Sequence, residues 1–449
     1  MVKFLSYLQS GSERSRNIKN NAVGAVAIKI IAMVIQIIQI PIVLSYLDST
    51  LYGIYLTITS LVLWTHNFDF GLGNGLRYKL TESLSKNDYN KGKSLVSTAY
   101  ISLFAIMALV ALCLIPIISI MNWQDLLNCN ILTNSYLITC VIIVLVTILI
   151  QFVLELITIV LQATQKAAIS TIFRPTANII ALMGVVVLRE YGTQSLLSAC
   201  IMLTLPIVIV LLIANIILYS KKLRYLSPSI RNYDKHHLKD IYSLGIKLFI
   251  TSLAGAVVFN LTNFLLSHYI NPNEVAVYQT AYTYFGTTVI FFGVLLTPFW
   301  AGITDAYVKG EIDWLKKCMR KLSHLTLLFS LLVIFLLAIS KFAFMIWIGN
   351  SLNITISLSV ALSIYFIGNL WSSTYNCFIV GVGKAQVSMY VALFKIIAFI
   401  PVAIFSIQHL GTIGIVVATI CINTLPNIVF GFVQYKLIVN NKAIGVWNK

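Results

Sequence analysis

The chain has 449 residues, of which 59% are hydrophobic and only 10% are charged, and its net charge is +17. Soluble domains carry about 25% charged residues, so this composition excludes an ordinary soluble protein. The long apolar segments predict an all-α integral membrane protein. Only helices or closed barrels can span lipid, and these segments lack the alternation of apolar and polar residues that barrel strands show.

Apolar segments long enough to cross the hydrocarbon core, which takes roughly 20 helical residues, recur along the whole chain. We expect the first of them to be an uncleaved span, because it is longer than the apolar region of a signal peptide. In all we predict about twelve transmembrane helices, at residues 21–47, 51–76, 94–121, 131–163, 168–188, 195–219, 241–270, 275–301, 318–348, 353–381, 386–407 and 412–438.

The positive charges predict the orientation of these helices. Of the 31 Lys and Arg residues, 25 fall in the termini and loops on one side of the predicted arrangement. The positive-inside rule places that side, with both termini, in the cytoplasm. Topology therefore explains most of the charge, and we expect no nucleic-acid partner.

The loops on the outer side are short, and the longest lies at about residues 122–130. Enzymes that polymerise or ligate sugars outside the bilayer usually need a larger outer domain, so we do not expect an enzyme. The seven cysteines lie mostly inside apolar segments and lack metal-ligand spacing, so neither a metal site nor a disulfide is expected.

The second half of the chain repeats the first. Tyr55 matches Tyr278 at an offset of 223 residues, and Lys166 matches Lys384 at an offset of 218. Two parallel sets of six helices are an arrangement that transporters use for alternating access around a central site. We predict an N-lobe, a cytoplasmic linker and a C-lobe, at residues 1–219, 220–239 and 240–449.

A glycine-rich segment, Phe-Asp-Phe-Gly-Leu-Gly-Asn-Gly-Leu-Arg at residues 68–77, closes the second predicted span. It lacks the spacing of a nucleotide-binding fingerprint, and no P-loop is found in the chain. Together with the chain length, the repeat and the short outer loops, it resembles the polysaccharide transporters of the multidrug/oligosaccharidyl-lipid/polysaccharide exporter superfamily. The nearest similarity is to Wzx-type flippases of O-antigen and capsule repeat units, and it covers nearly the whole chain.

This resemblance implies two lobes around a central cavity and a multi-pass protein of the bacterial inner membrane. It implies a flippase that moves an undecaprenyl-pyrophosphate-linked oligosaccharide from the cytoplasmic to the outer leaflet, with H⁺ or Na⁺ as a coupling ion and no other cofactor. Besides membrane lipids, a polysaccharide polymerase and its chain-length machinery are candidate partners of an expected monomer. The alternative is a cation or drug antiporter of the same superfamily.

Ionisable residues inside the membrane are costly, so each is a functional candidate. Lys29 and Lys247 occupy matching positions in the first and seventh spans. They either snorkel to the interface or face the cavity and bind the pyrophosphate. Lys395 has no obvious acidic partner and is a further candidate for this role, as is Arg174.

Three further residues are candidates for ion coupling or gating. Glu155 and Arg174 lie at similar distances from a tight turn, so Glu155 either forms a structural ion pair with Arg174 or lies on a path for H⁺ or Na⁺. His66 and Asp69 are one helical turn apart. They form either a hydrogen-bonded packing pair or a carrier of the coupling proton, since histidine titrates near neutrality.

Three residues are candidates for contact with the sugar. Tyr278 and Tyr282 could stack on sugar faces, although aromatic stripes more often serve packing alone. Gln36 continues the polar face of the helix that carries Lys29.

Overall fold

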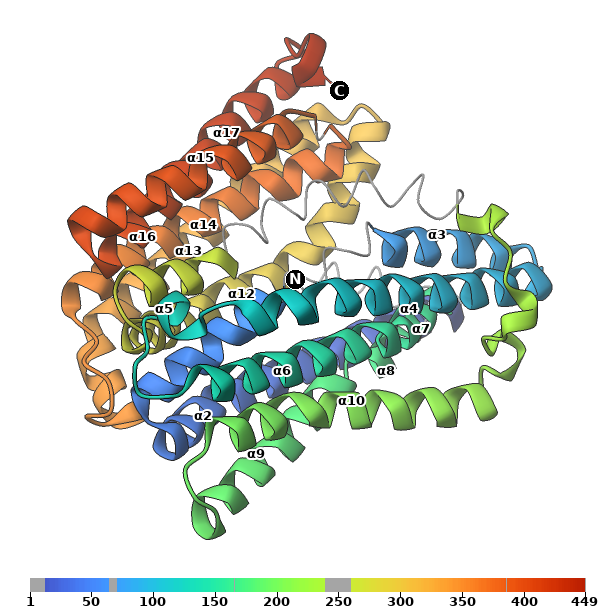
Figure 1. The fold of residues 1–449 in the computed structure, drawn as a ribbon. Helices are drawn as coiled ribbons and strands as arrows, with labels where there is room; N and C mark the ends of the chain where they lie inside the picture. Colours follow the sequence, from blue (N-terminus) through green and yellow to red (C-terminus); the bar gives the residue numbers. More distant parts are fainter. Residues whose placement is uncertain (1–12, 64–70, 165, 239–259, 385, 449) are drawn as a thin grey trace. The chain divides into compact units, whose positions relative to one another are not determined.

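The computed structural model describes residues 13–63, 71–164, 166–238, 260–384 and 386–448. Every regular element in these ranges is a helix (Figure 1). Eight helical segments are long and apolar enough to cross a membrane. The predicted all-α membrane fold is thereby confirmed, whereas the full count of twelve spans stays a prediction.

The helices follow one another in chain order. They are α2 (Glu13–Val62), α3 (Leu72–Ser85), α4 (Tyr89–Ile120), α5 (Trp123–Leu127), α6 (Asn134–Leu154), α7 (Leu156–Ala163), α8 (Ala167–Ser170), α9 (Phe173–Tyr191), α10 (Leu196–Ser220), α12 (Pro272–Val308), α13 (Ile312–Ile348), α14 (Ile356–Val382), α15 (Gln386–Leu410), α16 (Thr412–Thr419) and α17 (Leu425–Val439). Shorter helical turns are η2 (Arg224–Leu226), η3 (Ile230–Asn232), the π-helical turn η4 (Ile420–Thr424) and η5 (Gly445–Asn448).

The repeat in the sequence reappears in the way the helices begin. Helix α2 is two helices joined at Asp48, whose φ of 62° breaks the helical path. The Asp48 carboxylate accepts the N–H groups of Thr50 at 2.8 Å and Leu51 at 3.0 Å, and so caps the second part. Asn271 caps α12 in the same way by accepting the Glu274 N–H at 2.9 Å. Positions 48 and 271 differ by 223, the offset of the repeat.

The same offset relates the turns that precede α4 and α13. Asn87 and Gly310 both adopt a left-handed conformation, with φ of 58° and 73°. The residues that follow them, Asp88 and Glu311, are the N-caps of α4 and α13. The two halves therefore share turn geometry as well as residues, which supports the repeat independently of hydropathy.

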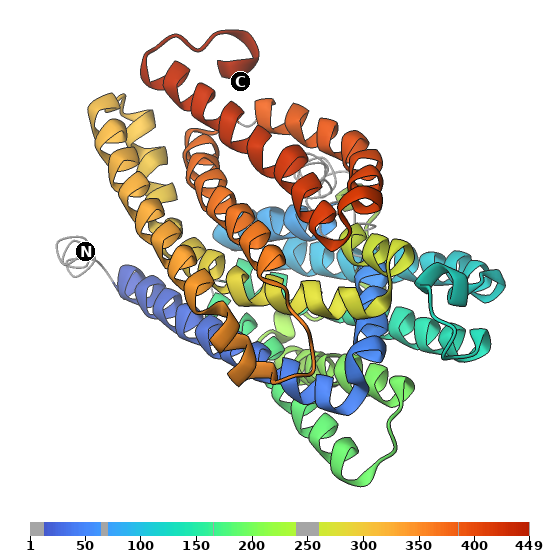
Figure 2. The ribbon, with the colours of Figure 1, turned by 90° about the vertical axis from the view of Figure 1, so that its left-hand side faces the viewer.

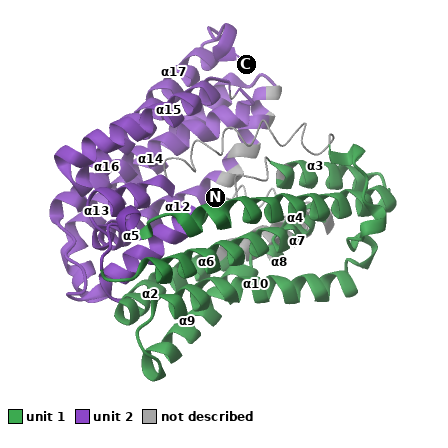
Figure 3. Ribbon diagram, in the orientation of Figure 1, with its two compact units in different colours: residues 1–47, 62–123, 131–249 green, residues 48–61, 124–130, 250–449 purple. Residues whose placement is uncertain are grey.

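The helices form two compact units (Figure 3). Unit 1 takes in the described residues of 1–47, 62–123 and 131–249, and unit 2 those of 48–61, 124–130 and 250–449. Two short segments of the first half of the chain thus pack with unit 2. The predicted boundary at 220–239 stays a prediction, because residues 239–259 lie outside the described part.

Within unit 1, α10 packs against α6 and α9, and α4 packs against α3 and α6. Within unit 2, α14 is central, because it packs against α12, α13 and α17. Helices α14 and α17 pack against each other, and Figure 2 shows α14 in orange next to α17 in dark red.

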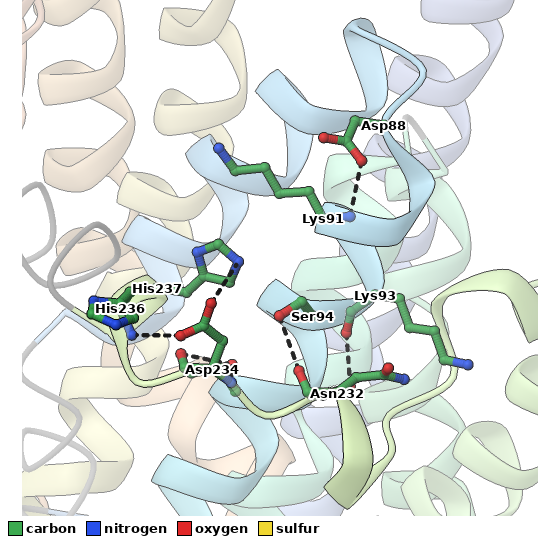
Figure 4. A network of polar contacts seen from close by, with 10 residues as sticks. Asp88, Lys91, Lys93, Ser94, Asn232, Asp234, His236 and His237 are labelled. Atoms are coloured by element: carbon green, nitrogen blue, oxygen red, sulfur yellow. Dashed lines mark hydrogen bonds and ion pairs between the residues drawn. The ribbon is translucent and has the colours of Figure 1, made fainter.

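The described part of the linker after α10 packs against α4 and is hydrogen-bonded to it (Figure 4). Leu226 is fully buried, and a Cβ placed on Gly92 of α4 would lie 3.1 Å from its side chain. Polar bonds between α4 and the linker include Ser94 Oγ to the Asn232 carbonyl (2.9 Å), the Ser229 N–H to Ser97 Oγ (3.1 Å) and the Asp234 N–H to Thr98 Oγ1 (3.1 Å).

A break between α6 and α7 at Glu155 interrupts the fourth predicted span. Inside a membrane, an unpaired carbonyl near such a break needs a partner from the protein. Asn215 of α10 supplies it, since its Nδ2 donates to the Leu154 carbonyl at 3.0 Å and to the Leu211 carbonyl at 2.8 Å. Its Oδ1 accepts the Tyr100 hydroxyl at 2.8 Å. One buried amide therefore joins α10 to the broken helix and to α4.

Replacing Asn215 by Leu is expected to destabilise the protein. The change leaves the Leu154 carbonyl and the Tyr100 hydroxyl without this partner, and an unsatisfied buried polar group costs about 1–3 kcal/mol. Ile216→Leu, on an exposed position of the same helix, is the control. Thermal unfolding in detergent should show a lower midpoint for Asn215→Leu only, and equal midpoints would contradict the account.

Candidate functional site

Unit 2 contains a seam where α17 lies unusually close to α14. A Cβ placed on Gly368 of α14 would lie 2.4 Å from Thr424 Cγ2. A Cβ placed on Gly431 of α17 would lie 2.7 Å from the Cβ of Tyr375 on α14. Two glycines therefore allow the close approach, and they fix the position of α17 along α14.

The π-helical turn η4 joins α16 to α17 at the N-terminal end of α17. Single π turns often occur at functional sites, because they re-aim side chains within a helix. Here the turn carries Asn423 and Thr424. The Thr424 side chain is buried, and its hydroxyl has no hydrogen-bond partner among the described residues.

Lys395 on α15 is the buried cation of this region. It is only 7% exposed, and its ammonium donates to Asn427 Oδ1 at 2.7 Å. Asn427 Nδ2 in turn approaches Asn423 Oδ1 at 3.4 Å. Within the described part of the chain Lys395 forms no salt bridge. An ammonium has three N–H donors, so this group has the capacity to bind an anion in addition to Asn427.

A second polar group in unit 2 links α12 to α14. The hydroxyls of Tyr282 and Tyr365 lie 3.5 Å apart. Asn369 Nδ2 donates to the Tyr365 hydroxyl at 3.3 Å, and Ser373 Oγ lies 3.5 Å from Asn369 Oδ1. The result is a file of hydroxyl and amide groups along one face of α14.

The two tyrosines expected to contact sugar lie beside this file. Tyr278 is buried and its ring is 5.7 Å from that of Tyr282. The Tyr282 ring also lies 4.9 Å from Phe366. Packing therefore occupies both rings in this structure, and contact with a sugar stays a prediction.

The described residues of unit 1 include an ion pair within the predicted spans. Arg174 Nη2 lies 3.0 Å from Glu155 Oε1 and 3.3 Å from Oε2, so the expected pairing is present. Gln151 Nε2 is 3.5 Å from the same carboxylate. Glu155 sits at the break between α6 and α7, where its position depends on the helix ends. A structural ion pair and a step on an ion path are the two roles that the charge exchange below distinguishes.

Of the other predicted site residues, the structure describes the side chain of Gln36 only. Gln36 is exposed on α2. His66, Asp69 and Lys247 lie outside the described residues, as does the side chain of Lys29. Their predicted roles are unchanged.

Several polar residues of the site were missed from the sequence. The signals were present as pairs of polar residues one turn apart in apolar segments: Asn423 with Asn427, and Asn369 with Ser373. What the sequence could not show is that Asn427 is the acceptor for Lys395, 32 positions away.

Comparison with known proteins decides the family. Residues 18–300 match the polysaccharide biosynthesis protein family. The chain belongs to this family. A relative from Yersinia pseudotuberculosis, named as a candidate O-antigen export protein, is 24% identical over 373 residues, which cover 80% of this chain and 82% of the relative. The predicted resemblance to Wzx-type flippases is thereby confirmed.

Solved structures show the fold of this polysaccharide biosynthesis protein. A multidrug resistance MATE family transporter of the MOP superfamily, in its inward-facing conformation, matches with a TM-score of 0.78 at 15% identity, covering 94% of this chain and 98% of that chain. The outward-facing conformation of a MATE family transporter matches with a TM-score of 0.64 at 14% identity, with 98% of both chains covered. Family and fold together confirm a membrane exporter or flippase rather than an enzyme.

Exchanging the charges of the ion pair distinguishes its two roles. We expect Glu155→Arg and Arg174→Glu each to lower the yield of folded protein severalfold, because like charges then meet near the helix break. The double exchange should restore both yield and polysaccharide export if the pair acts by mutual neutralisation. Yield without export would instead assign Glu155 to ion coupling.

Proposed function

We propose that this protein is a flippase for an undecaprenyl-pyrophosphate-linked oligosaccharide, which it moves from the cytoplasmic to the outer leaflet of the bacterial inner membrane. The observation that carries the proposal is the buried ammonium of Lys395, held by the neutral amide of Asn427 at 2.7 Å. The family match and the relative named for O-antigen export support the class of substrate.

The chemistry of such a substrate fits this ammonium. A pyrophosphate is an anion rich in hydrogen-bond acceptors, and a charge-assisted bond from an ammonium to phosphate is stronger than a neutral one. Because Asn427 is uncharged, it does not neutralise the Lys395 ammonium. Arg174 differs, since Glu155 already neutralises it. We therefore place Lys395 first among the predicted pyrophosphate ligands, with Lys29 and Lys247 as its expected partners.

A cation or drug antiporter is the alternative. Such a transporter would favour buried carboxylates facing the substrate path. The carboxylate described within the predicted spans of unit 1, Glu155, is paired with Arg174 at 3.0 Å. This pairing disfavours the antiporter, and the charge exchange above tests it.

Coupling to H⁺ or Na⁺ is part of the proposal. We assign the coupling ion to His66 and Asp69. Glu155 would join them only if the double charge exchange restores the yield of protein but not export. The protein is proposed to act as a monomer that hands its product to a polysaccharide polymerase and chain-length machinery.

Replacing Lys395 by Met tests the proposal, because Met keeps the length of the side chain and removes the charge. Loss of a charged hydrogen bond, worth about 1.5 kcal/mol or more, should lower export roughly tenfold or more. The measurement is the amount of polysaccharide displayed by cells that depend on this protein, normalised to the protein in the membrane.

Lys317→Met is the matched control, since it makes the same change at an exposed position before the predicted ninth span. Export at the control's level in Lys395→Met would remove Lys395 from the substrate site. Lys29→Ala with Lys247→Ala extends the test, and full export in that double variant would contradict a pyrophosphate site built on those lysines.

A further inference from the structure

Two short segments from the first half of the chain are built into unit 2: residues 48–61 and 124–130 (Figure 3). In the predicted topology, both segments lie on the outer side of the membrane. Residues 122–130 form the longest outer loop, and Asp48 lies at the outer turn between the first two spans. Their partners are the helical residues 260–269 and the turn before α12. These too lie at the outer side in the predicted topology.

The segment 48–61 contacts its partners through a glycine and a buried polar pair. A Cβ placed on Gly53 would lie 1.7 Å from the Pro272 carbonyl oxygen, so only glycine permits this approach. About two turns further on, Asn263 Nδ2 donates to Ser60 Oγ at 2.7 Å. Ser60 is 6% exposed and Asn263 is 4% exposed.

The loop segment 124–130 is held mainly through its backbone. The fully buried Ser267 hydroxyl donates to the Leu127 carbonyl at 2.9 Å. His268 Nδ1 lies 3.2 Å from the Leu126 carbonyl. Asn128 Nδ2 reaches back to the Ile270 carbonyl at 2.8 Å. Three successive residues, at the end of α5 and just after it, are thus bonded to the end of another helix.

We propose that these contacts form an outer latch, which closes the outer side of the transporter and must release each time the substrate leaves. The latch consists of Gly53 with Pro272, Ser60 with Asn263, and residues 126–128 with Ser267, His268 and Ile270. The inference requires a transporter but not the particular substrate proposed above.

The bonding of the latch suits contacts that break and re-form. Most of its hydrogen-bond acceptors are backbone carbonyls, those of Leu126, Leu127 and Ile270. Once the latch opens, water can replace a lost partner of these carbonyls with little change in free energy. Its buried pair is incompletely satisfied, because Asn263 Oδ1 has no hydrogen-bond partner among the described residues. A contact that leaves an acceptor unpaired stabilises the closed state less than a fully bonded one would.

A native thiol reports on the latch. Cys129 lies in the loop segment and is only 3% exposed when the latch is closed. We would label intact cells with a membrane-impermeant maleimide and take the signal absent from Cys129→Ser as that of Cys129. Gly53→Ala places a methyl group against the Pro272 carbonyl and should raise the labelling rate at least severalfold.

Gly293→Ala is the matched control, because a Cβ there meets nothing within 4 Å. It should label at the wild-type rate. Equal rates for Gly53→Ala and the wild type, with comparable amounts in the membrane, would overturn the latch. Since labelling needs no substrate, the result is separate from the outcome for Lys395→Met.

A cross-link covers the case in which Gly53→Ala fails to fold. Asn128→Cys and Ile270→Cys, in the Cys129→Ser background, would be bridged by a short bifunctional methanethiosulfonate reagent. We expect bridging to abolish polysaccharide export and a reductant to restore it, with either single cysteine unaffected. Undiminished export by fully bridged protein would overturn the proposal.

Discussion

Backbone polar groups that lie within a membrane must find partners inside the protein, because the hydrocarbon offers none. Continuous helices meet this constraint by themselves, so each interruption needs a dedicated side chain. Asp48 caps the helix that restarts after it, and Asn215 bonds the carbonyl of Leu154 beside the break at Glu155. Two of the candidate functional groups lie at or beside helix interruptions. Glu155 occupies one, and the π-helical turn with Asn423 adjoins the helix that holds the acceptor of Lys395.

The two halves of the chain share their turns but differ in where their helices are interrupted. In the first half the fourth predicted span breaks at Glu155, whereas its counterpart α14 is continuous and has Ser373 at the matching position. In the second half the last span contains the π-helical turn, whereas its counterpart α10 is continuous. Among the described residues, the ion pair of Glu155 with Arg174 lies in the first half and the buried Lys395 lies in the second. A duplicated scaffold has thus acquired different polar chemistry in each half.

Hydropathy, charge placement and the repeat were enough to predict the membrane fold, because each depends on residue type and position along the chain. The predicted contact between Glu155 and Arg174 was also within reach, since a tight turn separates them. The partnership of Lys395 with Asn427 was not, because it depends on how α15 packs against α17. The outer latch was equally hidden, because the close approach of the Pro272 carbonyl to Gly53 is visible only in the three-dimensional structure.

The central claim is that the protein moves a lipid because of its anionic pyrophosphate head group. The most direct measurement reconstitutes the purified protein in liposomes with a fluorescent polyprenyl-pyrophosphate oligosaccharide, and follows its transfer between leaflets by quenching from outside. The account predicts protein-dependent transfer of this lipid and little transfer of a neutral polyprenyl glycoside with the same sugar. Equal rates for the two lipids would contradict it, as would exchange of a cationic dye with no transfer of either lipid.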